Sequence, residues 1–183
     1  MNLVGTSIPG AWVIESKAFQ DNRGAFSRLF CSNELQAILG PLTIVQINHS
    51  MTPSVGTVRG LHYQNAPHSE MKIVRCLKGR VFDVAVDLRK DSPTFLKWHA
   101  VELTPENNLA YVIPEGCAHG FQVLEEDSQL LYLHTEFYTP KVEGAVRFDD
   151  PKIAVNWPLP PTDLSARDLG HPHLNENFKG LVL

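Results

Sequence analysis

The sequence predicts an all-β protein, built as a sandwich or a barrel of short strands. Short runs rich in Val, Ile, Phe and Tyr alternate with Gly, Pro, Asn and Asp along most of the 183 residues. This pattern is typical of antiparallel strands joined by turns. No long stretch with helical periodicity separates the runs. With 43% apolar residues, we expect one domain, residues 1–183, with a sizeable core.

The expected strands follow one another in close succession. They are residues 12–19, 26–31, 43–50, 58–64, 72–77, 81–87, 97–103, 109–113, 119–124 and 129–137. The tetrapeptide Leu77-Lys78-Gly79-Arg80 is expected to form a hairpin turn between two of them, because glycine tolerates the backbone of a tight turn.

Two short segments are expected to be helical. The first spans residues 32–40, with Ser32 as the N-cap and Gly40 just past the end. The second spans residues 162–169, after a proline-rich stretch. The tail, residues 170–183, has few strand signals, and we expect it to pack loosely.

Charge and composition exclude several classes of function. The net charge is −4 and no basic stripe is present, which argues against a nucleic-acid-binding protein. No apolar run reaches the roughly 18 residues of a membrane span. A basic segment followed by an apolar one, as in a secretion signal, is also missing at the start. The three cysteines have no metal-binding spacing, which is typical of the reducing cytoplasm.

The most informative residues are the charged ones on two strands, 58–64 and 72–77. Strict alternation places His62 and Gln64 on one face of the first strand and Arg59 on the other. In the second strand Lys72 shares a face with Val74. If the two strands pair, an imidazole and an ammonium converge on one sheet surface. Such groups are rarely placed inward without a partner or a function, so the sequence predicts a reaction site.

A second motif, PxGxxH, ends at His119. Downstream of a Gly-x-His strand, it resembles the paired motifs of the cupin superfamily. Most cupins hold a metal with several histidines, but Gln64 stands where the second histidine of the first motif is expected. A metal site from His62, Glu70 and His119 stays open but incomplete, because transition metals need three well-placed donors. We therefore predict a site without a metal.

Longer blocks are similar to one cupin family, the dTDP-4-dehydrorhamnose 3,5-epimerases of deoxysugar biosynthesis. The matching blocks, in order, are RGLHYQ (59–64), KIVRCLKGRVFDVAVDLRKDSPT (72–94), IPEGCAHGFQVL (113–124), YTPKVEGAVRFDDP (138–151) and VNWP (155–158). The resemblance runs from about residue 10 to residue 168. It implies a cupin-type double-stranded β-helix, or jelly-roll barrel, with short N- and C-terminal helices. It also implies a homodimer in which residues 23–30 reach the neighbour's site.

The resemblance implies a reaction without metal or cofactor. The substrate is a nucleotide-diphosphate sugar whose C4 ketone acidifies the hydrogens at C3 and C5. His62 is then the base, and Asp168 orients its imidazole. Lys72 stabilises the enolate charge, and Tyr132 is the acid on the opposite face. Without the resemblance, Tyr132 would be interpreted as a half-buried sheet aromatic and Lys72 as an edge-strand lysine.

Substrate-binding residues also follow from the resemblance. Arg23 and Arg59 match residues that hold the diphosphate. Gln46 and Asn48 match polar residues near the nucleotide. Phe19 and Phe26 are expected either to form walls for the thymine ring or to pack in the core as ordinary aromatic residues. A histidine matches a sugar-site residue. The implied set is Arg23, Phe26, Arg28, Gln46, Asn48, Arg59, His119, Glu143 and Arg167.

Three of the matched positions depart from the family's usual residues. Arg28 stands where Glu is usual, Glu70 where Gln is usual, and Arg167 where Lys is usual. The last change keeps the charge and the first two do not. One hypothesis is that Arg28 and Glu70 compensate each other. These departures leave the nucleotide and the exact sugar open.

Three classes of function remain at this stage. The leading one is an epimerase acting at C3, C5 or both on a 4-keto-6-deoxyhexose, or a close variant, a single-carbon epimerase or ketoisomerase on a GDP- or CDP-sugar. The second is a metal-dependent cupin enzyme, favoured by His68 and Glu70 near His62. The third is a cupin that only binds a sugar nucleotide or a protein. An acid–base set has no purpose in such a binding module, which argues against the third.

Overall fold

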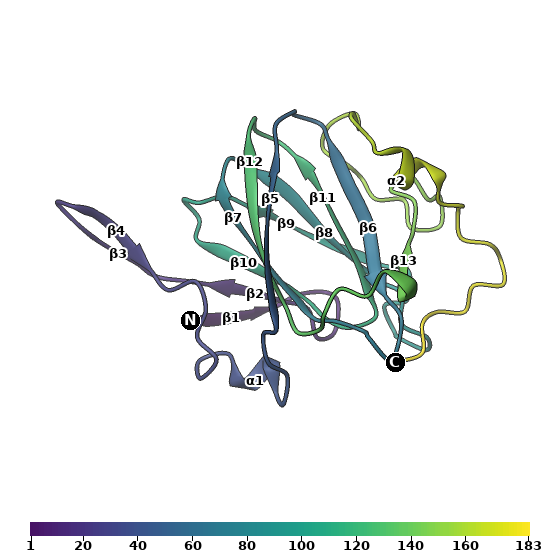
Figure 1. Cartoon of the computed structure of the whole chain (residues 1–183), viewed down its shortest axis with the longest axis horizontal. Coiled ribbons are helices and arrows are strands. Elements are labelled where there is room, and N and C mark those ends of the chain that lie inside the picture. The colour runs from purple at the N-terminus through teal and green to yellow at the C-terminus, as the bar shows by residue number, and fades with distance from the viewer.

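Two antiparallel sheets facing each other form the body of the protein, as the computed structural model of residues 1–183 shows (Figure 1). In spatial order, the six-stranded sheet contains β1 (Asn2–Gly5), β2 (Trp12–Glu15), β10 (Leu109–Ile113), β7 (Lys72–Lys78), β12 (Ser128–His134) and β5 (Gln46–Thr52). The five-stranded sheet contains β13 (Glu143–Ala145), β6 (Val58–Gln64), β11 (Cys117–Val123), β8 (Val81–Asp87) and β9 (Trp98–Leu103). The predicted all-β class is confirmed.

The main core lies between the two sheets. Alternate residues of each strand point inward, so Val74 and Cys76 of β7 pack with Leu130 of β12 and with Phe121 and Val123 of β11. All five side chains are almost fully buried. The alternation seen in the sequence of 72–77 thus predicted the inward face of β7 correctly. Lys72 lies on the same face as Val74 and Cys76, at the start of the strand.

Two further layers cover the outer faces of the sheets. Leu35 and Leu39, beside and within the helix α1 (Gln36–Leu39), pack on Ile73 and Leu133 of the six-stranded sheet. On the opposite side of the molecule, segments after β13 cover the outer face of the five-stranded sheet. The two covering layers are visible below and to the right of the barrel in Figure 1.

The tail after residue 170 takes part in this covering layer. Leu174, Phe178 and Leu181 pack against the cluster on the outer face of the five-stranded sheet. Leu181 also forms a parallel bridge with Arg89. These contacts are long-range, and a strand-by-strand pattern search does not detect them.

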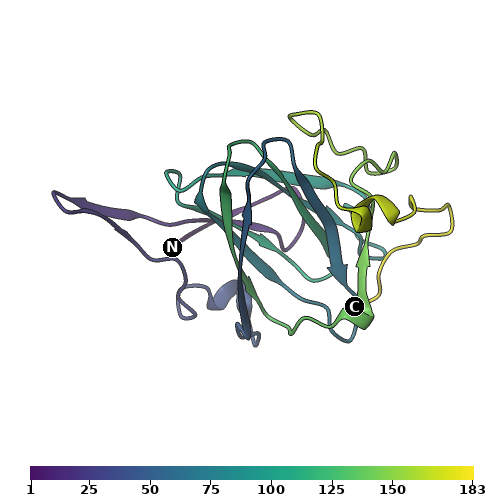
Figure 2. The ribbon, with the colours of Figure 1, turned by 45° about the horizontal axis from the view of Figure 1, so that its top comes forward.

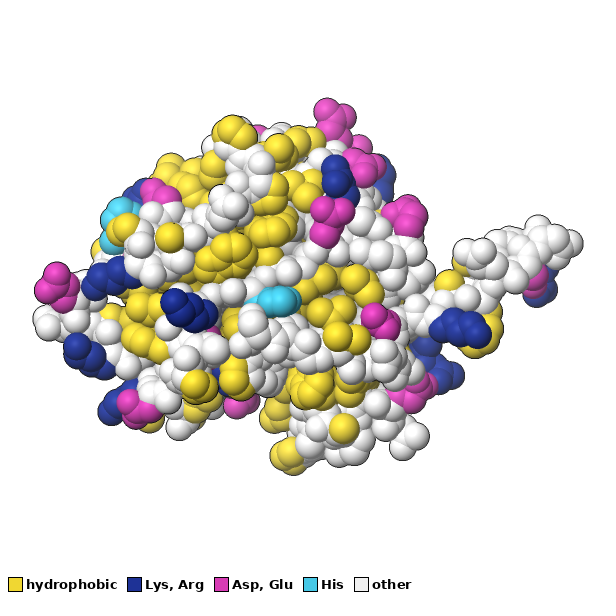
Figure 3. Space-filling model, turned by 180° about the vertical axis from the view of Figure 1, so that it is seen from behind, with side chains coloured by type: hydrophobic (Ala, Val, Ile, Leu, Met, Phe, Trp, Pro, Cys, Tyr) yellow, Lys and Arg dark blue, Asp and Glu magenta, His cyan; other side chains and the backbone are white.

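A two-stranded hairpin extends away from the body. It consists of β3 (Ala18–Asp21) and β4 (Gly24–Ser27), and both ribbon views show it projecting into solvent (Figure 2). Phe19 and Phe26 face each other across the hairpin and remain 63% and 70% exposed. The view from behind shows the same arm standing clear of the body (Figure 3). We refer to β3 and β4 together as the arm.

The strands at 58–64 and 72–77 do not pair with each other. β6 and β7 belong to different sheets and face each other across the barrel. The expected hairpin at 77–80 is wrong for the same reason, because β7 and β8 also lie in different sheets. A jelly-roll chain crosses between sheets at turns that look like hairpin turns in the sequence, so turn residues alone do not reveal the partner strand.

The two short helices are close to their expected places. α1 begins three residues later than expected, its N-cap is Leu35 without a side-chain bond, and Gly40 ends it at a φ of +56°. Ser32 is therefore not the cap. The second helix, α2 (Ala166–Gly170), is capped by Ser165, and a single 3-10 turn, η1 (Pro140–Val142), precedes β13. No helix of the structure is long and apolar enough to cross a membrane.

Candidate active site

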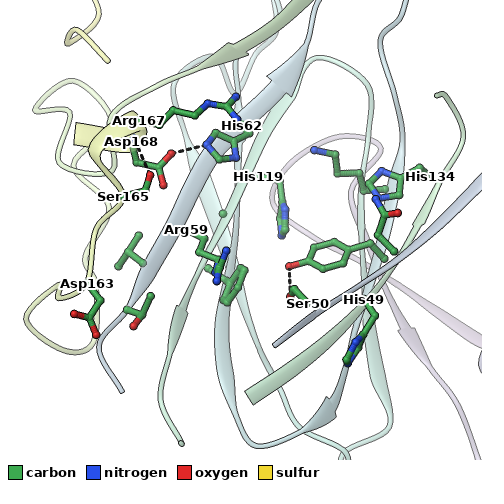
Figure 4. Close-up of a pocket in the computed structure, with 17 residues that line it drawn as sticks. His49, Ser50, Arg59, His62, His119, His134, Asp163, Ser165, Arg167 and Asp168 are labelled. Atoms are coloured by element: carbon green, nitrogen blue, oxygen red, sulfur yellow. Dashed lines mark hydrogen bonds and ion pairs between the residues drawn. The ribbon is translucent and has the colours of Figure 1, made fainter. Parts of the chain in front are cut away.

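A polar cavity of about 510 Å³ opens between the two sheets. Only three of the 17 residues that line it are hydrophobic, so it suits a polar ligand better than an apolar one. β6 and β11 form one wall and β5, β7 and β12 the opposite wall, while residues at and just before α2 close one side (Figure 4). The strands thus bring residues distant in sequence into one site.

His62 on β6 is held by Asp168 on α2. The Nε2 of His62 lies 2.6 Å from Oδ1 of Asp168, and Ser165 at the helix N-cap accepts a bond from the Asp168 amide at 3.0 Å. Burial acts to raise the pKa of Asp168, but the hydrogen bond and charge of His62 outweigh burial and leave it below its ordinary value. Because an ionised carboxylate only accepts, Nε2 of His62 is the protonated nitrogen. Its Nδ1 then holds the lone pair that a base needs.

A bulge places Arg59 on the same side as His62. In a regular strand residues three apart point to opposite faces, yet both side chains line the cavity. Gly60 and Leu61 together lie opposite Gly120 of β11, and the extra residue reverses the alternation. The strands approach closely there: a Cβ on Gly120 would lie 2.5 Å from the carbonyl oxygen of Arg59. The expectation that Arg59 faces away is therefore wrong.

Tyr132 lies on the opposite wall from His62. Its hydroxyl is 3.1 Å from Oγ of Ser50 on the neighbouring strand, an interaction drawn in Figure 4. Burial raises the pKa of Tyr132 well above that of an exposed tyrosine. The phenol is therefore held in its protonated form, which is the form of a proton donor.

A second imidazole–carboxylate pair lies deeper in the barrel. His119 of β11 faces His62 in the neighbouring strand, and its Nε2 is 2.8 Å from Oδ1 of Asp83. Asp83 is fully buried on β8, and burial raises its pKa although the His119 charge opposes the shift. The ring of His119 meets the ring of Tyr132 edge-on, with centroids 6.1 Å apart. His119 is thus fixed beside the phenol.

Positive charge is available on both walls of the cavity. The side chain of Lys72 is only 12% exposed, and it lines the cavity from β7. Arg59 donates its Nε to Thr52 at 3.0 Å, and its two terminal nitrogens keep no protein partner. The Nη2 of Arg167, on α2, lies 2.5 Å from Oε2 of Glu143. Fixed guanidinium groups of this kind suit a phosphate-bearing ligand.

The structure gathers most of the predicted site residues around this cavity. His62, Lys72, Tyr132 and Asp168 all line it. So do the predicted binding residues Asn48, Arg59, His119 and Arg167. Gln46 and Glu143 line a smaller adjoining cavity of about 160 Å³, which shares His62 and Lys72 with the first.

Three predicted binding residues lie elsewhere in the chain. Arg23 and Phe26 are on the arm, where Arg23 pairs with Asp21 at 2.6 Å. Arg28 follows the arm and pairs with Glu34. The chain therefore does not bring these three to its own cavity. Within one chain Arg28 does not compensate Glu70 either, because each has other partners.

The metal set considered from the sequence is not assembled. Glu70 contacts Lys72 and His134, not His62 or His119. The cluster with potential metal-ligand geometry is His62, Asp168 and His171, whose donor atoms lie within 4.8 Å of one another.

Sequence reasoning did not single out several residues that support the site. Ser50 and Asp83 bond the proposed acid and the buried histidine, and Ser165 caps the helix that carries Asp168. Asp83 was detectable, because it points inward in the apolar strand VFDVAVD. His134 was also detectable from the sequence, because it follows Tyr132 by two residues and so lies on the same inward face of the strand.

The chain is similar to known proteins over nearly its whole length. The family model described as dTDP-4-dehydrorhamnose 3,5-epimerase matches residues 5–176. An enzyme of that name from Salmonella typhimurium is 42% identical over 180 residues, 96% of this chain and 97% of the relative.

Solved structures show the same similarity in three dimensions. That of dTDP-4-dehydrorhamnose 3,5-epimerase from Elizabethkingia anophelis superimposes with a TM-score of 0.91 at 38% identity, covering 97% of this chain and 98% of the other. A Legionella pneumophila epimerase in complex with dTDP-4-keto-L-rhamnose gives 0.87 at 40% identity, covering 92% and 89%. The expected cupin-type barrel is confirmed.

Proposed function

This chain belongs to the family of dTDP-4-dehydrorhamnose 3,5-epimerases, and we propose that it inverts C3 and C5 of a dTDP-linked 4-keto-6-deoxyhexose with His62 and Tyr132 as its base and acid. It is an isomerase. The observation that supports these roles is the placement of the His62–Asp168 pair and Tyr132 on opposite walls of one cavity. Inversion requires a proton to leave one face of the sugar and to return to the other.

The first step is proton removal by His62. Its Nδ1 takes a proton from the carbon beside the ketone, and the C–H electron pair moves onto the C4 oxygen to form an enolate. Asp168 stabilises the imidazolium that results, because its carboxylate stays ionised next to Nε2–H. Lys72 offers its ammonium to the enolate oxygen, as a preorganised cation does.

The second step is proton return by Tyr132. The enolate carbon takes the phenolic proton on the face opposite to His62 and the C4 ketone re-forms. Burial keeps that phenol protonated beforehand. His62 then releases its extra proton to solvent and the Tyr132 phenolate takes a proton from solvent, after which the same pair acts at the second carbon. These side chains complete the proton transfers, so the proposed steps need no metal or cofactor.

The nucleotide part of the substrate is proposed to bind next to the sugar. Arg59 and Arg167 line the cavity and can hold a diphosphate. Asn48 and Gln46, on β5, lie toward the adjoining cavity, where the polar part of the nucleotide would fit. His119 would contact the sugar beside Tyr132.

We propose that the arm completes the site of a second copy of the chain. Phe19 and Phe26 are exposed on it. Neither Arg23 nor Phe26 lines the chain's own cavity. Ile47 and Met51 on the edge strand β5 are also exposed, at 61% and 58%. Exposed apolar groups of this size favour association between copies. In a homodimer, Arg23 would add a cation for the diphosphate and Phe26 a wall for the base.

The cellular location is proposed to be the cytoplasm. The cysteines Cys31, Cys76 and Cys117 are all free thiols, which suits a reducing compartment. Burial raises the pKa of Cys117 to about 12 and that of Cys76 to about 11, so neither is a ready nucleophile.

Proton exchange with solvent tests the function directly. The chelator-treated protein in D2O should place deuterium at C3 and C5 of dTDP-4-keto-6-deoxyglucose, followed by NMR. His62→Asn should lower the exchange rate about 100-fold or more, since it removes the base. Tyr132→Phe should still exchange label but should not invert the carbons.

The same assay carries its own controls. GDP- and CDP-linked 4-keto sugars test the choice of nucleotide. Label at only one carbon would identify a single-carbon epimerase, and a product with its ketone at C3 would identify a ketoisomerase. Absence of any label with all three nucleotides, or normal inversion by Tyr132→Phe, would contradict the proposal.

A further inference from the structure

A buried carboxylate that the proposed reaction does not use lies beside the cavity. Glu70 precedes β7, and its side chain is only 9% exposed. One oxygen, Oε1, is 3.0 Å from Nζ of Lys72. The other, Oε2, is 2.7 Å from Nδ1 of His134 on β12. Glu70 thus joins two adjacent strands at the end where the proposed site lies.

The charge on Glu70 is maintained despite its burial. Burial acts to raise its pKa, but the hydrogen bond from His134 and the charge of Lys72 outweigh burial and leave the pKa below its ordinary value. The ionised carboxylate accepts from both neighbours. Breaking such a buried pair leaves the remaining charge without a partner, which is strongly unfavourable.

The contacts continue from Glu70 toward the proposed acid. His134 is opposite Lys72 in the pairing of β12 with β7. The ring of His134 lies nearly parallel to that of Tyr132, with an interplanar angle of 20° and centroids 6.1 Å apart. On its far side Nε2 of His134 lies 3.2 Å from Nδ2 of Asn48. One carboxylate is therefore linked to the cation and to the acid of the site.

We propose that Glu70 is a positioning residue that fixes the Lys72 ammonium against the cavity wall and, through His134, the ring of Tyr132. The inference rests on the proposed function, because it assigns Glu70 to the same reaction. Lysine has a flexible four-carbon stem, and a cation stabilises developing charge well only when it is already in place. Burial disfavours a lone ammonium, and the Glu70 carboxylate offsets that cost.

A double-mutant cycle tests whether Glu70 acts through Lys72. Glu70→Met keeps the length of the side chain and removes its charge and both hydrogen-bond acceptors, and it should lower kcat about 10- to 100-fold with KM changed less than about twofold. In a Lys72→Ala background the same change should lower kcat less than about threefold further, because the group it positions is missing. Glu70→Asp, which keeps the charge, should recover part of the rate. The deuterium-exchange assay measures wild type and these four variants.

A matched control separates positioning from stability. Asp149 also binds an arginine and a histidine, Arg147 at 2.8 Å and His173 at 3.2 Å, but outside the cavity. Asp149→Asn should leave kcat within about twofold of wild type. The inference is overturned if Glu70→Met has the wild-type rate, or if it loses the same factor with and without Lys72.

A crystal structure of Glu70→Met gives a readout that does not depend on activity. The Lys72 ammonium should leave residue 70 and occupy more than one conformer, and an unmoved ammonium would overturn the inference. If wild type exchanges no label, the proposed function fails while this structural test still decides the role of Glu70. Should Glu70→Met not fold, His134→Asn removes one of the two links and should disorder the ring of Tyr132.

Discussion

At the level of single residues, the proposed reaction depends on which nitrogen of His62 holds its proton. Asp168 determines this, because its ionised carboxylate lies 2.6 Å from Nε2 and accepts a hydrogen bond from Nε2–H. Nδ1 is then free to act as the base. A carboxylate that only orients an imidazole can still contribute strongly to the rate.

Replacement of that carboxylate should be costly for the rate. We expect Asp168→Asn to lower kcat about 100-fold, with a KM within about threefold of wild type, because it removes the charge that stabilises the imidazolium. Initial rates of deuterium exchange and of product formation measure the effect. Unchanged kcat would show that Asp168 does not assist His62. Ser165→Ala, which loses only the cap of α2, should have a much smaller effect.

Strand alternation predicted the direction of most, but not all, of the site's side chains. Alternation placed His62 and Lys72 inward correctly. It placed Arg59 outward, and the bulge at Gly60 reversed that. A bulge depends on two strands meeting at one register, so the sequence of one strand does not reveal it.

At the level of elements, the arm is a separate two-stranded sheet that joins neither sheet of the barrel. Its two strands pair only with each other, and Figure 1 shows it extending away from the strands of the barrel. A two-stranded hairpin is marginally stable alone in water. Packing of the arm on a second copy would bury Phe19 and Phe26 and stabilise it.

Mixed dimers test whether the arm serves the neighbour's site. Arg23→Glu should weaken the arm's contact with substrate, and His62→Asn should inactivate the site of its own chain. Coexpression of the two inactive variants should restore about a quarter of wild-type activity, since half the dimers are mixed and each mixed dimer has one intact site of two.

The alternative arrangement gives a different result. If each arm served its own site, every site in a mixed dimer would contain one lesion and no activity would return. Coexpression of Arg23→Glu with wild type checks that the variant assembles. A monomer in analytical ultracentrifugation would contradict the homodimer altogether.

At the level of the whole molecule, covering layers on both outer faces hold the barrel. Asp87 helps to fasten one of them. Its buried carboxylate accepts from Arg89, Ser92 and Thr94 at 2.5–2.9 Å, and Arg89 bridges to Leu181 in the tail. These bonds outweigh its burial and lower the pKa of Asp87 from 3.8 to about 2.

The pH dependence of stability should report this network. A carboxyl whose pKa is lowered by folding stabilises the fold above its unfolded value of 3.8, and this contribution is lost as the pH falls toward 2. We expect Asp87→Asn to reduce the free energy of unfolding by about 3 kcal/mol at neutral pH. The difference from wild type should shrink steadily below a pH of about 4. Urea unfolding across this range measures it, and a constant difference would contradict the assignment.

The all-β class, most strand positions and the inward face of strands such as β7 could be predicted from the sequence, because these depend on local periodicity. The resemblance to the epimerases predicted that His62, Lys72, Tyr132 and Asp168 share one site, and all four line the cavity. That β6 and β7 lie in different sheets, facing each other across the barrel, is visible only in the folded chain. The links of Glu70 to Lys72 and His134 likewise became visible only there. Periodicity indicates to which face of a strand a side chain points, whereas sheet register and chain crossings determine which residues it contacts.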